Sequence, residues 1–138
     1  VNKIIRDIQE GIPSFLFIPL TYQIFSRVDG ETGSFQDALR RIVTRMSSDH
    51  PYHCIGQLIA LANGDKVGTG VSGRQANMYL GNVGSSKIEA SKEILQEIAK
   101  DSKKKNGRSY VASLIDSYTA IYESYIQLAM CSTKKFVN

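Results

Sequence analysis

Residues 34–62 read SFQDALRRIVTRMSSDHPYHCIGQLIALA and contain two consecutive helix patterns. In the first pattern, apolar residues recur at the i, i+3, i+4, i+7, i+8 and i+11 spacing of one helical face. These residues are Phe35, Ala38, Leu39, Ile42, Val43 and Met46. Ser34 stands where a hydroxyl can cap the helix, and Asp37 follows three residues later, where an acidic side chain completes a capping box. We therefore predict a helix over residues 34–48.

The second pattern begins at Pro51, since proline is well accommodated at the first helical position, and ends at the turn-forming pair Asn63-Gly64. At 100° per residue, apolar side chains nearly encircle this helix. One side carries Tyr52, Ile55, Ile59 and Ala62, and the other carries Cys54, Leu58 and Leu61. We predict a helix over residues 51–63 that neighbours must cover on several sides.

Helical periodicity continues through the rest of the chain, and no stretch alternates like a strand for more than a few residues. Further helices are predicted over residues 1–10, 14–28, 87–101 and 108–131. Pro19 is expected to kink the second of these, and Ser86 with Glu89 forms a capping box at the start of the third. Residues 64–84 hold six of the eleven glycines and are predicted to form a flexible loop. The predicted fold class is all-α, in one helical segment.

Composition narrows the class of protein. The chain has 138 residues, 42% hydrophobic and 22% charged, which fits one globular domain or a piece of a larger one and excludes disordered and collagen-like chains. The longest apolar run, Phe15 to Leu20, is far shorter than the roughly 20 residues of a membrane span. The two cysteines, Cys54 and Cys131, form no disulfide framework, so a reducing, intracellular compartment is expected. Because the sequence begins at Val1 without a signal peptide, we expect an excised segment.

One glycine pattern matches a phosphate-binding motif by its letters alone. Gly68, Gly70 and Gly73 have the G-x-G-x-x-G spacing that cradles phosphates between a strand and a helix N-terminus. Here the preceding residues are predicted to be helical, and no strand adjoins the glycines. The context therefore favours a loop over a nucleotide site.

Three neighbouring residues could ligate a metal ion. His50, His53 and Cys54 project within about 100° of arc if His50 continues the helix that follows it. Zinc needs a fourth donor, which Cys131 could supply in three dimensions. The favoured alternative is that His50 caps the helix, His53 hydrogen-bonds a neighbouring helix and Cys54 packs as a small apolar group. We predict no metal site, with these residues as the candidates.

Basic side chains form two groups. Arg40, Arg41 and Arg45 occupy the polar face of the helix over residues 34–48, and Lys103-Lys104-Lys105 is expected at a turn between helices. With a net charge of +4, these groups are either solvated surface or contacts for an anionic partner.

Several motifs occur in a family-specific order. They are Ile12-Pro13-Ser14-Phe15, then Phe17-Ile18-Pro19-Leu20-Thr21-Tyr22-Gln23-Ile24, then the helix of Phe35 to Met46, then Asp49-His50-Pro51-Tyr52-His53 running into Leu58 to Asp65. Over residues 12–66 this order resembles the C-terminal part of the FAT region of the phosphatidylinositol-3-kinase-related protein kinases. Over residues 85–131 the resemblance rests mainly on the order of helices.

The resemblance implies antiparallel helical hairpins stacked as a TPR- or HEAT-like solenoid immediately before a kinase domain. The parent would be a nuclear serine/threonine kinase of the DNA-damage response that uses ATP and Mg²⁺. No ATP-anchoring lysine context, catalytic-loop Asp/Asn set or DFG-type triplet occurs here, so none of the family's active-site residues can be assigned. The implied partners are the kinase domain, neighbouring helices of the same chain and a homodimer mate; neither direct nucleic-acid contact nor a membrane is expected.

The predicted function is therefore a non-catalytic helical scaffold that packs against and regulates a kinase domain. The alternative is an independent helical module that binds an anionic partner, DNA or an acidic protein, through its basic faces. No catalytic residue and no cofactor site is assigned to the segment. The residues predicted to make packing contacts are Phe35, Leu39, Ile42, Met46, Pro51, Ile55, Leu58, Leu114, Tyr118, Tyr122 and Tyr125.

Overall fold

The computed structural model describes residues 11–66, 84–106 and 110–131, apart from the side chains of residues 102–106 and 130. Within these ranges every regular element is a helix and no strand occurs, so the predicted all-α class is confirmed. The elements are the 3-10 helix η1 (Ser14–Leu20) and the α-helices α2 (Thr21–Phe25), α3 (Ser34–Asp49), α4 (Pro51–Ala62), α6 (Ser85–Asn106) and α7 (Tyr110–Met130). No described helix is both long and apolar enough to span a membrane.

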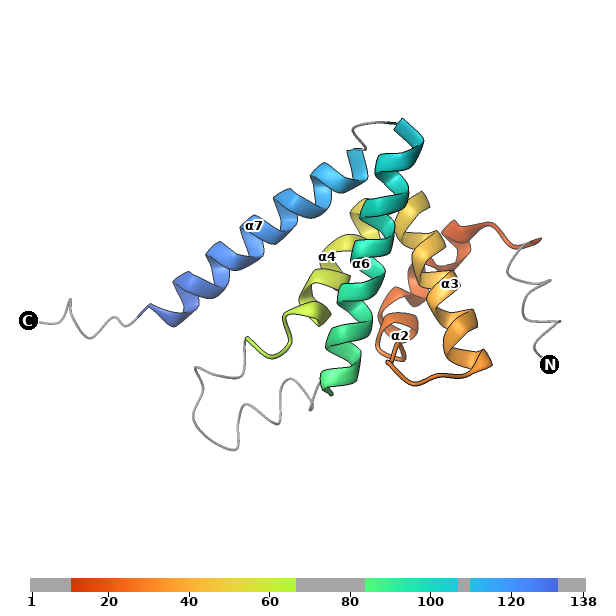
Figure 1. Ribbon diagram of the computed structural model, residues 1–138, viewed down its shortest axis with the longest axis horizontal. Coiled ribbons are helices and arrows are strands. Elements are labelled where there is room, and N and C mark those ends of the chain that lie inside the picture. The colour runs from red at the N-terminus through yellow and green to blue at the C-terminus, as the bar shows by residue number, and fades with distance from the viewer. Residues whose placement is uncertain (1–10, 67–83, 107–109, 132–138) are drawn as a thin grey trace, which may run out of the picture.

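The long helices alternate in direction along the chain (Figure 1). Each of α4, α6 and α7 runs roughly opposite to the helix before it, which gives the antiparallel hairpins expected from the sequence. α4 lies at the centre and contacts α2, α3, α6 and α7. The C-terminal half of α7 projects from the body formed by the other helices (Figure 1). The bundle is thus built around α4.

The hydrophobic core explains why α4 is central. Cys54, Ile55 and Leu58 are fully buried, and Ile59 is 1% exposed. The elements α2, α3, α6 and α7 together cover this apolar surface, and the exposed residues of α4 are Tyr52 and His53. The rest of the buried cluster comes from the surrounding elements and comprises Phe25, Val28, Leu39, Val43, Met46, Ala90, Ile94, Ile98 and Ile115.

The N-terminal part differs from the prediction of one kinked helix over residues 14–28. The chain forms the 3-10 helix η1, which contains Pro19, and then the short α2, which ends at Phe25. Pro19 has no N–H to donate and its ring disfavours a continuous α-helix, so the α-helical pattern starts only beyond it. Val28 follows α2 in irregular structure but is still 1% exposed.

Both predicted capping boxes are wrong. α3 begins at Ser34 itself, its N-cap is Gly33, and no side chain caps it. α6 begins at Ser85, and the hydroxyl of Ser86 hydrogen-bonds the Asp29 carboxylate, which holds the pKa of Asp29 below its usual value. The Ser86 hydroxyl therefore binds Asp29 in the loop between α2 and α3 and does not cap α6.

α6 also continues five residues past its predicted end at residue 101, so Lys103, Lys104 and Lys105 lie within the helix and not at a turn. Three features of the sequence fall outside the described residues. They are the predicted helix over residues 1–10, most of the predicted loop over residues 64–84, and the G-x-G-x-x-G pattern of Gly68, Gly70 and Gly73.

A pair of leucine truncations tests the central place of α4. Leu58→Ala is expected to lower the free energy of unfolding by about 2–5 kcal/mol, because it removes buried methyl groups and leaves a cavity. Leu128→Ala makes the same change at a side chain that is 68% exposed, and it is expected to stay within about 0.5 kcal/mol of the parent chain. Urea unfolding followed by circular dichroism measures both. Equal losses in the two variants would contradict the described core.

Candidate functional site

The residues predicted to pack fall into three groups by burial. Leu39, Met46, Pro51, Ile55 and Leu58 are buried, whereas Ile42, Leu114, Tyr118 and Tyr122 are half-buried against the core. Phe35 and Tyr125 lie at the surface, 58% and 67% exposed. Apart from Phe35, the residues of α3 and α4 in this set thus make internal contacts, and the far end of α7 is left uncovered by the described residues.

A polar cluster fastens η1 to the corner between α3 and α4. The Ser14 hydroxyl donates a hydrogen bond of 2.6 Å to Oδ2 of Asp49, and its oxygen lies 3.1 Å from Nε2 of His50. Ser14 is only 7% exposed. Arg45 approaches the same Asp49 oxygen at 3.7 Å. Because the three elements meet here, this cluster fixes the position of η1.

The hydrogen bonds of Ser14 differ from those of a nucleophilic serine paired with a general base. The single hydroxyl proton of Ser14 is used toward Asp49, so Nε2 of His50 must donate to the serine oxygen. A general base would instead accept that proton. Ser14, Asp49 and His50 therefore form a structural tie, which the sequence analysis did not identify.

The candidate metal ligands are not assembled. The described residues contain no group of three or more His, Cys, Asp or Glu side chains placed to hold a metal ion. His50 occupies the N-cap position of α4 without a side-chain capping bond and instead faces Ser14. His53 is exposed, and Cys54 is fully buried. Cys131, the fourth donor considered, is exposed beyond the end of α7.

Both cysteines are free thiols in different environments. Burial raises the pKa of Cys54 from 9.0 to about 11, so this thiol stays protonated near neutral pH and packs as a small apolar group. The folded chain keeps this proton where the unfolded chain loses it. Consequently the thiol makes the native state less stable as the pH rises from about 9 to about 11.

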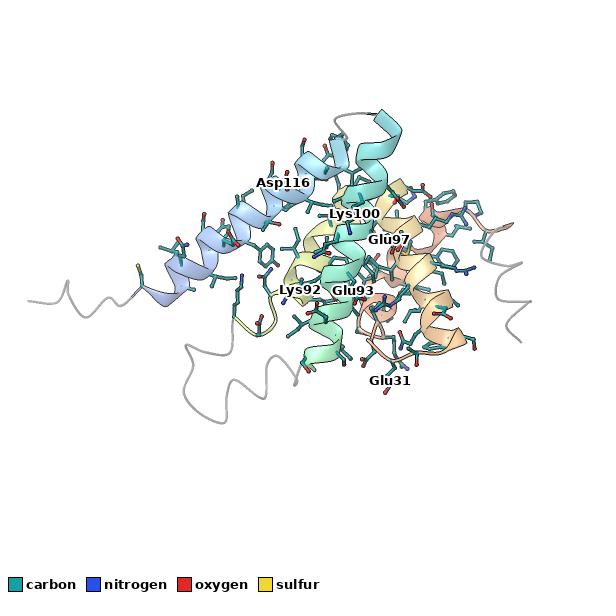
Figure 2. The ribbon with its side chains drawn as sticks, viewed as in Figure 1. Glu31, Lys92, Glu93, Glu97, Lys100 and Asp116 are labelled. Atoms are coloured by element: carbon teal, nitrogen blue, oxygen red, sulfur yellow. The ribbon has the colours of Figure 1, made fainter. Side chains whose placement is uncertain are left out.

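The arginine face of α3 is partly neutralised by acidic side chains. Arg40 makes a 2.8 Å ion pair with Glu93 of α6, and Arg45 lies 3.7 Å from Asp49. Glu97 of α6 lines the same shallow hollow as these arginines. Glu93 and Glu97 lie along α6, together with Lys92 and Lys100 (Figure 2). The face is therefore a mixed-charge contact between α3 and α6.

Two tyrosines join the N-terminal ends of α4 and α7. The rings of Tyr52 and Tyr110 meet edge to face with centroids 5.7 Å apart and an interplanar angle of 61°. A hydrogen bond with Tyr52 raises the pKa of Tyr110 to about 12. Both rings keep more than half of their surface exposed, so the pair is an accessible contact at the top of the bundle.

The chain is similar in sequence to known protein kinases. It is 33% identical over 140 residues to the serine/threonine-protein kinase ATM of Arabidopsis thaliana, a match that covers 98% of the chain. It is 39% identical over 70 residues to the serine-protein kinase ATM of Sus scrofa, and 31% identical over 61 residues to the serine/threonine-protein kinase TEL1 of Candida albicans. These matches cover 48% and 44% of the chain. No family model and no solved structure matches the chain.

The chain spans only 3% of the length of the plant relative and 2% of the other two. The plant match nevertheless runs through all the described helices. The chain is therefore a region of the phosphatidylinositol-3-kinase-related kinase class, as its motifs indicated. Within that class it is ATM-like.

Replacing Ser14 tests the polar tie. Ser14→Ala is expected to lower the free energy of unfolding by about 1–3 kcal/mol, because Asp49 and His50 lose their partner in a partly buried place. It should also speed amide hydrogen exchange in η1 more than in α6. Ser48→Ala, at an exposed serine of α3, is the control and should have little effect. If both variants matched the parent chain, the tie would contribute nothing to holding η1.

Alkylation rates test the environment of the two thiols. In the folded chain at mildly alkaline pH, iodoacetamide is expected to modify Cys131 rapidly and Cys54 at least about 100-fold more slowly, because Cys54 is buried and holds its proton. Peptide mass spectrometry resolves the two sites. In concentrated urea the rates should converge. Equal native rates would show that α4 is not enclosed.

Proposed function

We propose that this chain is the C-terminal part of the FAT region of an ATM-like kinase and serves as a non-catalytic scaffold. In this role it packs against and regulates the adjoining serine/threonine kinase domain. The main support is the enclosure of α4, whose apolar faces meet α2, α3, α6 and α7 at once. A helix buried in this way couples its neighbours mechanically. Close-packed side chains have low compressibility, so a displacement of one helix is transmitted to the helices that it contacts.

The distribution of surface apolar residues also supports a scaffold. Large apolar side chains are exposed at both ends of the described bundle. On η1 they are Phe15, Leu16 and Leu20, and on α7 they are Ile121, Tyr125 and Leu128. Such groups at the two ends of a helix stack are suited to pack against further helices, as in solenoid proteins where each unit contacts its neighbours.

The relatives also indicate what the whole polypeptide does. The relatives are protein kinases that are far longer than this chain. We infer that the parent of this segment is a nuclear DNA-damage-response kinase, that its kinase domain uses ATP and Mg²⁺, and that this segment contributes packing surface to it. The kinase domain and neighbouring helices of the same chain are the inferred partners, and homodimerisation is a further inferred contact.

The alternative of an anionic partner on α3 has less support. DNA or an acidic protein would have to compete with Glu93 and Asp49, which already pair with Arg40 and Arg45. In the described part of this face Arg41 is exposed and takes part in neither of these ion pairs. The scaffold is therefore the function that the arrangement supports best.

A core substitution in the full-length kinase tests the scaffold. Leu58→Ala is expected to change the ratio of basal to stimulated kinase activity at least about twofold, because it loosens α4 against its four neighbours without touching catalytic chemistry. Activity is measured on the purified kinase at a temperature where circular dichroism shows full helicity. Lys100→Ala, at an exposed position of α6, is the control. Unchanged activity in a Leu58→Ala protein that is measurably less stable would refute the regulatory role.

A further inference from the structure

A hollow of about 280 Å³ lies where α4, α6 and α7 meet. Each of these three helices contacts the other two. The floor of the hollow is aliphatic and includes Ile59 of α4, Leu95 of α6 and Ile115 of α7. Ile59 and Ile115 belong to the buried core and are 1% and 9% exposed. The floor is therefore held in place by core packing, as in the largely preformed sites that bind small ligands.

Polar side chains surround this floor. Lys92 and Gln96 stand one turn apart on α6, and Thr119 comes from α7. The ammonium, the amide NH₂ and the hydroxyl can each donate a hydrogen bond. Within the described ranges, none of these three side chains takes part in a hydrogen bond or an ion pair. The rim therefore offers three donors that have no acceptor among the described groups.

The charge at the rim indicates what kind of ligand fits. Among the described residues that line the hollow, Lys92 alone is charged (Figure 2). Acidic side chains on the same helices are engaged elsewhere, since Glu93 pairs with Arg40 and Glu123 lies 4.0 Å from Lys66. One cation beside two neutral donors is suited to a group with a single negative charge.

Two other hollows on the described surface lack this combination. One is lined by residues of α7 alone, so no second helix would enclose a ligand there. The other lies between α3 and α6, and its described lining consists of three arginines, Thr44 and Glu97, with no aliphatic side chain. Of the three, the hollow between α4, α6 and α7 is the one that joins an apolar floor to unpaired donors.

The size of the hollow limits what can occupy it. At roughly 30 Å³ for each water-sized group, it holds about nine such groups. A helix is about 10 Å across with its side chains and does not fit inside. An apolar helix laid over the rim would cover the donors without giving them acceptors, because its own carbonyls are already hydrogen-bonded. A short apolar chain that ends in a carboxylate fills the floor and satisfies the donors.

We propose that this hollow binds an amphiphilic monocarboxylate whose unbranched chain has about eight carbons. The chain lies on the aliphatic floor, and the carboxylate accepts hydrogen bonds from Lys92, Gln96 and Thr119 at the rim. A bound ligand contacts α4, α6 and α7 at once, so it stabilises their arrangement according to its concentration. The inference is separate from the proposed function, because it does not assume that the chain belongs to a longer kinase.

Octanoate tests the proposal in a titration of the 138-residue chain followed by heteronuclear NMR. Binding is expected to saturate with a dissociation constant on the order of 1 mM or lower, as suits a ligand of about ten non-hydrogen atoms. The amide shifts should centre on the residues of α6 and α7 that line the hollow. Octylammonium has the same chain with the opposite charge, and it should bind about tenfold more weakly.

Three variants locate the site. Lys92→Gln should weaken octanoate binding about fivefold, because it removes the cation and leaves a neutral donor. Lys100→Gln, at an exposed lysine of the same helix that does not line the hollow, is the matched control and should leave binding unchanged. Ala99→Phe should abolish binding by filling the hollow, provided that circular dichroism shows the parent helicity. Since Lys92 is exposed, its variant tests the site without disturbing the core.

Several outcomes would overturn the proposal. They are equal affinity for octanoate and octylammonium, equal effects of Lys92→Gln and Lys100→Gln, and an absence of saturation below about 10 mM. Shifts that centre on Leu128, whose side chain is 68% exposed, would show adsorption to bare apolar surface and would overturn it as well. None of these outcomes bears on the test of Leu58→Ala in the kinase.

Discussion

The arrangement of this chain depends on covering the apolar surface of α4 with several other helices. Cys54, Ile55 and Leu58 are fully buried on one side of the helix, and its exposed residues are Tyr52 and His53. No single neighbour can remove so much apolar surface from water, so α2, α3, α6 and α7 must all be in place. The alternating directions of α4, α6 and α7 bring these three helices against one another.

Polar contacts then fix the positions of η1 and the start of α6, which apolar burial alone would leave free to shift. Ser14 ties η1 to Asp49 and His50 at the end of α3, and Ser86 ties the start of α6 to Asp29. Both join elements that are distant in the chain. Burial alone is non-directional and would tolerate small shifts of these elements, whereas hydrogen bonds with defined donors do not. The bundle is therefore held at its edges as well as at its centre.

The two ends of the described bundle differ from its interior in a way that bears on function. η1 and the far half of α7 expose large apolar side chains, while the α3–α6 face is covered by paired charges. The chain spans a small fraction of its kinase relatives, so these surfaces are suited to contacts with the rest of such a polypeptide.

The sequence by itself determined the all-α class, the positions of α3 and α4 to within one residue, and the need to enclose α4, because helical periodicity and the Pro51 start are local properties. The sequence did not determine how α3 and α6 are capped at their N-termini, where α6 ends, or that the predicted helix over residues 14–28 divides near Pro19. At each of these places the local pattern fits more than one helix boundary. Only the tertiary structure brought Ser14 to His50 and left the α7 face bare. Those features depend on which surfaces meet, and no spacing of residues along one chain encodes that directly.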